Sequence, residues 1–178
     1  MGNFSVIVRW QGLGDGFIWA CSRVYGPNDN NLRGQLWDEL IGIQQLSEVP
    51  WCYIGDFNIV RFPSEWLGGS CLSLTMENFS EFIEELSLLD LPLEGGSFTW
   101  SSGSDQPSMS NIDRVLVSHD WEDHHPDVNQ QVLSHPISDH FPILVKAGGI
   151  LREKSPFRFE NMWLKSDGFK DRVLSWWN

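Results

Sequence analysis

The sequence predicts an α/β domain built from layers of strands and helices. Residues 17–25 and 51–56 are rich in the aromatic, β-branched and small apolar residues typical of strands. Between them, residues 31–46 carry leucines, isoleucines and a tryptophan at close to helical spacing. This order predicts a crossover unit with two parallel strands, the building block of layered α/β folds. The 178 residues are enough for one such domain with a real core.

The chain opens with a predicted hairpin. Residues 4–10 form its first strand, residues 17–25 its second, and the glycine-rich stretch Gln11–Gly16 connects them. That stretch lacks the Lys-Ser/Thr pair of a phosphate-binding loop and opens no helix, so a hairpin turn is the better interpretation. A turn follows the second strand and leaves Asn28 or Asp29 to cap the first helix.

The second half of the domain predicts another helix and several short strands. Apolar residues at i, i+3, i+4 and i+7 from Phe79 to Leu86 predict a helix with Thr75 as its cap and residues 88–92 as its end. Its glutamates form a solvated acidic face. The remaining strands are expected over residues 98–101, 112–118, 128–133 and 141–146, with a polar loop or short helix over 119–127.

The composition changes after this domain. We expect the domain to span residues 1–147 and a basic linker with an amphipathic segment to span residues 148–178. This tail holds half of the 12 basic residues. It stops at Trp176-Trp177-Asn178, which looks like a cut in a longer chain.

Charge and cysteine content restrict the function classes. The net charge of −12 is a poor electrostatic match to a polyanion. Either the substrate is not nucleic acid, or bound cations neutralise acidic groups, or basic surface lies elsewhere. The three cysteines lack a C-x-x-C pair and indicate a reducing compartment. With no signal peptide or apolar span, we expect an intracellular protein, nuclear or cytoplasmic, without a membrane partner.

A carboxylate and a carboxamide follow the strand over residues 51–56. Asp56 and Asn58 are spaced i, i+2, so strand alternation would turn both to one side and Phe57 into the packing. Such a pair can position a water or hold a metal-bound phosphate. Gly-Asp-x-Asn is equally well a simple turn, because all three residue types favour turns.

Two further polar spots lie at predicted strand ends. Asp113 sits in an apolar strand and needs a partner, for which a salt bridge to an arginine such as Arg114 on another strand is the structural explanation. Asp139 and His140 can serve one site only at a bend. Histidine beside carboxylates suits acid–base chemistry near neutral pH, and oxygen ligands suit Mg²⁺. Together the three spots describe metal-assisted attack of water on a phosphoester.

These motifs resemble a known superfamily. Gly55-Asp56-Phe57-Asn58, then Ser110-x-Ile112-Asp113-Arg114, then Ser138-Asp139-His140 looks like the endonuclease/exonuclease/phosphatase superfamily, and Tyr25-x-Pro27-Asn28 resembles its tyrosine motif. Residues 95–100 and 156–163 resemble plant LINE-type (non-LTR) retrotransposon proteins, in which this endonuclease domain precedes a reverse transcriptase. The resemblance implies a DNase I-like α/β sandwich, with mixed sheets packed together and helices outside.

The resemblance also implies the activity and one half of the site. The activity is nicking of DNA by a Mg²⁺-dependent endonuclease, with Mn²⁺ as the alternative ion. His140 contacts the scissile phosphate and handles a proton, and Asp113 hydrogen-bonds His140. Asp139 lies at the metal. A reverse transcriptase, fused or neighbouring, is the expected partner besides DNA.

The other half of the implied site comes from the earlier motifs. Asp56 orients or activates the attacking water, and Asn58 helps to position that water and the phosphate. Tyr25 and Asn28 bond the phosphate oxygens.

The sequence also departs from the family pattern. The family carries an early asparagine and a metal-binding glutamate upstream of the tyrosine motif, but none of the 24 residues before Tyr25 forms that motif. Glu39 and Glu48 follow it and do not correspond by position. The usual arginine of the third motif is Asn111 here. We therefore expect an incomplete, N-terminally truncated domain that exposes apolar surface and a sheet edge and binds metal poorly.

Three hypotheses follow for the function. The first is the C-terminal part of a DNA endonuclease domain. The second is a catalytically inactive retroelement remnant with no enzymatic role. The third is a hydrolase of phospholipid headgroups or inositol phosphates, against which the segments that resemble retrotransposon proteins argue.

Overall fold

The computed structural model of the chain describes residues 3–103, 106–134, 138–147 and 175. The chain divides into two compact units, Met1–Gly148 and Gly149–Asn178. The expected linker and amphipathic segment over 148–178 lie outside the described residues, apart from Ser175. Among the described residues, no helix has the length and apolar character needed to cross a membrane.

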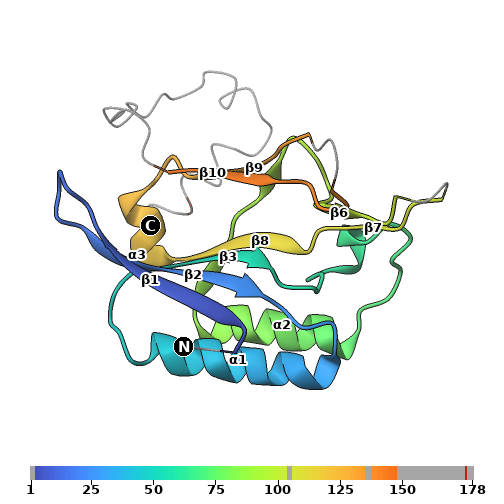
Figure 1. Cartoon of the computed structure of the whole chain (residues 1–178), viewed down its shortest axis with the longest axis horizontal. Helices are drawn as coiled ribbons and strands as arrows, with labels where there is room; N and C mark the ends of the chain where they lie inside the picture. Colours follow the sequence, from blue (N-terminus) through green and yellow to red (C-terminus); the bar gives the residue numbers. More distant parts are fainter. Residues whose placement is uncertain (1–2, 104–105, 135–137, 148–174, 176–178) are drawn as a thin grey trace. The chain divides into compact units, whose positions relative to one another are not determined.

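A mixed sheet of five strands forms the centre of the first unit (Figure 1). Its order is β1 (Ser5–Gln11), β2 (Ile18–Tyr25), β3 (Trp51–Asp56), β8 (Asp113–Ser118) and β4 (Leu88–Asp90). The strands β1 and β2 form the predicted antiparallel hairpin. The strands β2 and β3 are parallel and are joined by helix α1 (Asn30–Gln44), which confirms the predicted crossover unit.

Shorter elements complete the described part of the domain. A three-stranded sheet has the order β10 (Ile143–Lys146), β9 (Asn129–Val132) and β5 (Leu93–Glu94), and a two-stranded one pairs β6 (Trp100–Ser101) with β7 (Met109–Ser110). The helices are α2 (Leu74–Glu85), α3 (His119–His124) and the 3₁₀ turn η1 (Pro63–Glu65).

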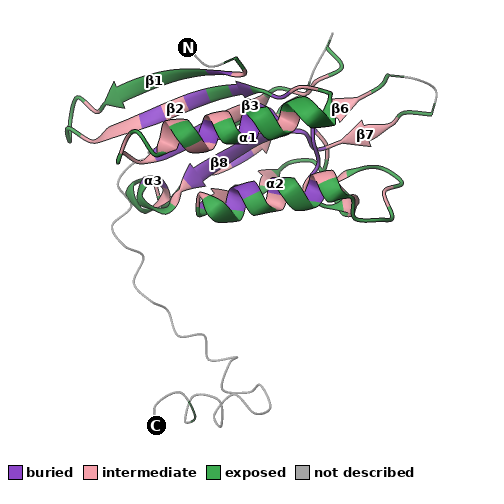
Figure 2. Ribbon diagram, turned by 90° about the horizontal axis from the view of Figure 1, so that it is seen from below, coloured by how far each residue is buried: buried purple, intermediate pink, exposed green. Residues whose placement is uncertain are grey.

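The two faces of the five-stranded sheet carry different layers. Helices α1 and α2 lie side by side on one face and turn their buried stripes toward it (Figure 2). That side holds stacked aromatic rings, among them Trp37, Phe79 and Phe82. The other face packs residues such as Val115 and Trp121 against side chains of β9 and β10 and their flanks. This arrangement confirms the predicted fold class, sheets packed together with helices outside.

Two local predictions were wrong. Helix α2 begins at Leu74, and its cap is Ser73, whose Oγ accepts a hydrogen bond from the Met76 amide at 3.4 Å. Thr75 already lies in the first turn, whereas a capping residue needs the extended backbone that Ser73 has. Residues 88–92 do more than end this helix, because β4 pairs with β8 and forms the outer strand of the sheet opposite β1.

The expected exposed edge is present at β1. This strand pairs only with β2 within the described sheet. Its side chains Val6, Val8 and Trp10 are 61%, 44% and 52% exposed. These three residues form what we call the β1 strip. It leaves apolar surface and unpaired backbone groups accessible together.

Candidate active site

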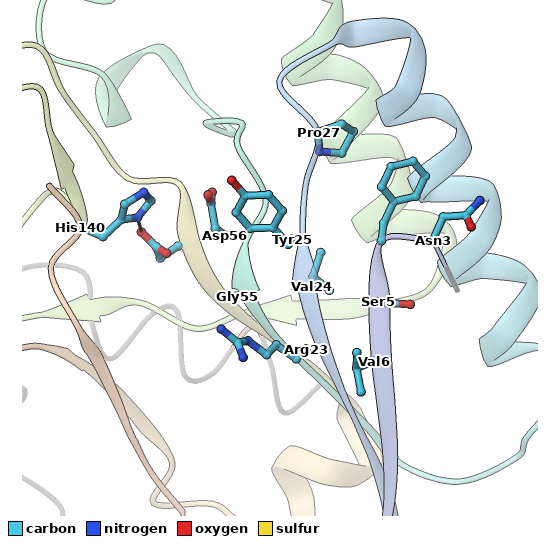
Figure 3. A pocket seen from close by; sticks show the side chains of 12 residues that line it. Asn3, Ser5, Val6, Arg23, Val24, Tyr25, Pro27, Gly55, Asp56 and His140 are labelled. Carbon is cyan, nitrogen blue, oxygen red and sulfur yellow. Dashed lines mark hydrogen bonds and ion pairs between the residues drawn. The ribbon is translucent and has the colours of Figure 1, made fainter. Parts of the chain in front are cut away.

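The ends of three neighbouring inner strands bring polar side chains together at one end of the central sheet. Tyr25 ends β2, Asp56 ends β3 and Asp113 begins β8. Tyr25 and Asp56 are paired across β2 and β3, and Asp56 and Asp113 are paired across β3 and β8. Together with His140 they line a cleft of about 690 Å³ (Figure 3). Four of the predicted site residues therefore meet in one place.

The predicted pair Asp56 and Asn58 is adjacent, but through a turn. The Asn58 amide donates to Asp56 Oδ1 at 2.8 Å, and Asn58 Nδ2 donates to Oδ2 at 3.0 Å. Asn58 has a φ of 52°, so the chain leaves strand geometry before it. Phe57 is buried completely, as predicted. The predicted turn is therefore present, and the functional role of the pair stays a prediction.

Gly55 is required by this turn. It has a φ of 146°, and a Cβ at this position would lie 2.0 Å from the Val24 carbonyl oxygen. A side chain would therefore separate β2 from β3 just below Asp56.

Asp113 is held beside the histidine. Its Oδ2 lies 2.9 Å from His140 Nδ1, which is the contact that the family resemblance implies. The alternative partner is wrong, because Arg114 instead pairs with Asp90 at 2.8 Å and with Glu65. Adjacent residues of a strand face opposite sides, so Asp113 and Arg114 serve different layers.

A buried threonine supports this pair. Thr99 Oγ1 accepts hydrogen bonds from the backbone amides of Ile112 and Asp113 at 3.1 and 2.9 Å. The Thr99 carbonyl accepts one from the Phe141 amide at 2.7 Å. Thr99 thus links the segment that carries Asp113 to the segment that carries His140. Sequence reasoning missed this role, although a small polar residue in a predicted strand was a signal for it.

The surroundings of the cleft raise the pKa values of both His140 and Asp56. Burial lowers the pKa of His140, but the hydrogen bond with Asp113 and the charges of Asp113, Asp56 and Asp139 outweigh it and raise this pKa. Burial, assisted by the nearby charges of Asp113 and Asp139, raises the pKa of Asp56 to about 6. The Asn58 amide and His140 oppose that shift. Asp56 can therefore change protonation close to neutral pH, and His140 keeps its proton to a higher pH than an unperturbed imidazole.

Asp139 and Asn28 are placed differently from the four predicted residues that line the cleft. Asp139 lies at the expected bend, where its Oδ2 accepts a hydrogen bond from Trp100 Nε1 at 3.1 Å. That bond lowers the pKa of Asp139. Asn28 is exposed, and its carbonyl accepts from Arg33 at 3.1 Å. None of Asp139, Asn28 and Asn58 lines the cleft.

The described residues do not complete a metal site. Within them, no group of three or more His, Cys, Asp or Glu side chains could hold a metal ion. The carboxylates of the site are committed to other partners: Asp56 to Asn58, Asp113 to His140 and Asp139 to Trp100. Mg²⁺ demands near-octahedral oxygen coordination, which this donor set does not fit by itself.

Two arginines near the site were missed. Arg33 donates to the carbonyl oxygens of Pro27, Asn28 and Asn58 at 3.1, 3.1 and 2.9 Å, and so ties together the turns after β2 and β3. Arg23 lines the cleft itself. Its spacing of two residues from Tyr25 on a strand was the signal that could have found it.

Comparison with solved structures supports the fold. The chain is similar to the endonuclease domain of TRAS1, a telomere-specific non-LTR retrotransposon, with a TM-score of 0.64 and 15% identity over 82% of this chain and 64% of that one. It is similar to the 3′ phosphatase NExo from Neisseria bound to a product DNA hairpin, with a TM-score of 0.55 and 19% identity over 80% and 65%. An AP endonuclease from Archaeoglobus fulgidus gives a TM-score of 0.57 and 14% identity over 79% and 64%.

In each comparison the chain spans less than two thirds of the relative's length. Among curated proteins, none matches the chain. These solved structures share their fold with the chain. The model of the Endonuclease/Exonuclease/phosphatase family matches residues 2–140, and the chain belongs to this family.

Proposed function

We propose that this chain is part of a DNA endonuclease domain that hydrolyses phosphodiester bonds. The observation that supports this most strongly is that Tyr25, Asp56 and Asp113 lie together at the ends of adjacent strands, with His140 hydrogen-bonded to Asp113. Carboxylates, a phenol and an imidazole in one open cleft provide the groups needed to activate water and to bind a phosphate.

The proposed roles follow from the hydrogen bonds and the accessibility of each group. Asp113 occupies His140 Nδ1, which leaves Nε2 to face a phosphate and to carry a proton. Asp56 accepts two hydrogen bonds from Asn58, which hold its carboxylate toward an attacking water. Tyr25 is 69% exposed, so its hydroxyl is accessible to a phosphate oxygen.

Metal dependence is also part of the proposal. The expected ion is Mg²⁺, or Mn²⁺ in its place, and Asp139 is the carboxylate that this chain would contribute. Because the described donors do not complete a coordination shell, further ligands would come from residues outside the described set, from water or from the substrate. Asn28 is proposed to contact a phosphate from the rim of the cleft.

The biological setting is a proposal of the same kind. Similarity to a non-LTR retrotransposon endonuclease domain supports a role in DNA nicking during LINE-type retrotransposition, with a reverse transcriptase as partner. A relative solved with a DNA hairpin supports DNA as the substrate. The plant lineage and the truncation rest on the sequence motifs.

Plasmid nicking in the presence of Mg²⁺ tests the activity. We expect nicking by the wild-type chain and a loss of at least about 100-fold in His140→Ala and Asp56→Ala, since each removes a proton-transfer or water-positioning group. His119→Ala replaces an exposed histidine on α3 and should nick like wild type. Equal background nicking in all four proteins would show that this chain is not an enzyme.

The second candidate function is a catalytically inactive remnant. It is favoured by the incomplete donor set among the described residues. Thermal unfolding with and without Mg²⁺ separates the two candidates, because an ion that binds only the native state raises Tm. An increase in Tm that Asp139→Asn abolishes supports a metal-binding enzyme. An unchanged Tm together with background nicking supports the remnant.

A further inference from the structure

The cleft contains a cation that the proposed chemistry does not use. Arg23 lies on β2 two residues before Tyr25, so both side chains leave the same face of the strand. Among the described residues that line the cleft, Arg23 is the only lysine or arginine. Figure 3 shows its guanidinium extending from β2 past Gly55, on the side of the sheet that carries Asp56 and His140.

The surroundings leave this guanidinium available to a ligand. Within the described part of the chain, the Arg23 side chain forms no ion pair or hydrogen bond, and the residue is exposed. The two carboxylates of the cleft are bonded elsewhere, Asp56 to Asn58 and Asp113 to His140. Although the chain has a net charge of −12, an unpaired arginine inside the cleft attracts an anion locally. The guanidinium fork matches phosphate oxygens in particular.

Its place along the strand decides which phosphate it can reach. Two residues of strand separate the Tyr25 and Arg23 backbones by about 6–7 Å. This is comparable with the spacing of successive phosphates along a nucleic-acid strand. A phosphate held between Tyr25 and His140 would therefore leave Arg23 beside the next phosphate.

We propose that Arg23 binds the phosphate next to the one that is cleaved, so that the site selects a strand with at least two phosphates over a single phosphodiester. This inference rests on the proposed function and adds a positioning residue and a substrate class to it. It also explains how an acidic chain can bind a polyanionic substrate, because a single positive side chain inside the cleft contacts the phosphate.

Binding tests the inference without any need for turnover. Fluorescence anisotropy with a short labelled duplex would compare wild type, Arg23→Gln, Arg23→Lys and Arg9→Gln. Arg9 is the matched control, because it is an exposed arginine on the neighbouring strand β1 that does not line the cleft. We expect Arg23→Gln to weaken binding about tenfold and to reduce the salt slope by about one phosphate contact. Arg23→Lys should retain part of the affinity, and Arg9→Gln should stay within about twofold of wild type. Equal losses in Arg23→Gln and Arg9→Gln would overturn the inference.

A scan of neutral phosphates locates the contact. Single methylphosphonates placed along the duplex should reveal a position that weakens binding to wild type but not to Arg23→Gln. In kinetics, Arg23→Gln should raise KM for an oligonucleotide while turnover of bis(p-nitrophenyl) phosphate, a single phosphodiester, stays within about twofold. If both substrates lose turnover equally, Arg23 contacts the cleaved phosphate and the inference is wrong.

The outcomes separate this inference from the proposed function. Arg23-dependent binding without nicking would refute the endonuclease activity and retain the phosphate contact. Nicking with no Arg23-dependent methylphosphonate position would refute the contact and retain the activity. A chain that neither binds nor nicks refutes both.

Discussion

A hydrogen bond and burial place the two acidic residues of the cleft in different protonation environments. Asp113 is bonded to the His140 ring, whereas Asp56 is buried and accepts both of its bonds from Asn58. The first arrangement favours a charged imidazole, and the second favours a carboxyl that keeps its proton up to a higher pH.

Replacement of Asp113 should lower the pKa of His140. Asp113→Asn removes the negative charge that raises this pKa and leaves the burial that lowers it. We expect a clear fall in this pKa, measured by NMR titration of the imidazole. Asp139→Asn, which removes a weaker influence on the same ring, should change the pKa less. An equal effect of both substitutions would contradict the role of the Asp113 contact.

Asp56 should make stability depend on pH. Folding raises its pKa from 3.8 to about 6, so the native state binds more protons than the unfolded chain between these values. Its contribution to stability is present below pH 3.8 and is lost as pH rises through 6. Between pH 4 and 7, we expect the free energy of unfolding of wild type to fall by about 1–2 kcal/mol relative to Asp56→Asn.

Urea unfolding at the two pH values measures this difference. Asp38→Asn, on the exposed face of α1, is the control and should follow the wild-type pH dependence. If Asp56→Asn also follows the wild-type dependence, the burial of Asp56 does not affect its protonation.

At the scale of elements, the close approach of β2 and β3 builds the site. The two strands are parallel and end together at Tyr25 and Asp56, because α1 returns the chain to the same end of the sheet. Arg33 near the start of α1 then bonds the turns that follow both strands. The helix therefore positions the site as well as covering the core.

Glycine substitutions should have opposite effects in these elements. Gly55→Ala places a Cβ 2.0 Å from the Val24 carbonyl oxygen at a φ of 146°, so we expect a loss of at least about 3 kcal/mol or failure to fold. Gly42→Ala in α1 meets nothing within 4 Å and should stabilise the helix by about 0.5–1 kcal/mol. Chemical denaturation monitored by circular dichroism measures both. A Gly55→Ala variant as stable as wild type would contradict the proposed need for glycine there.

At the scale of the whole described domain, one sheet edge remains uncovered. The β1 strip combines apolar side chains with an unpaired strand edge, which is a template for association. Repulsion between the acidic chains opposes association only weakly at this strip, because salt screens charges beyond about 8–10 Å at physiological ionic strength.

Disruption of the β1 strip should reduce self-association. Val8→Lys introduces a charge in the middle of the edge strand, so we expect a lower association constant by about tenfold with little change in Tm. Sedimentation velocity over a range of concentrations measures it. Leu13→Lys removes a fully exposed leucine in the hairpin turn and serves as the control. If both variants associate like wild type, the strip is not the contact surface.

The prediction from sequence was most complete where local patterns decide the structure. The hairpin, the helix–strand crossover and the turn at Gly55-Asp56-Phe57-Asn58 all follow from residues close together in the chain. The short strands β4, β5 and β7 were not predicted, since two or three residues carry no periodicity and form a strand only when a partner is present. The catalytic roles of Tyr25, Asp56, Asp113 and His140 stay predictions until activity is measured.

Apolar spacing and turn-forming residues act locally, so the fold class and the order of the motifs could be predicted from the sequence. Which polar groups meet depended on the three-dimensional packing of the chain. It paired Asp113 with His140 rather than with an arginine, placed Asn28 outside the cleft and placed Arg23 inside it. Such pairings depend on strand register and on contacts between residues far apart in the chain, which local patterns do not specify.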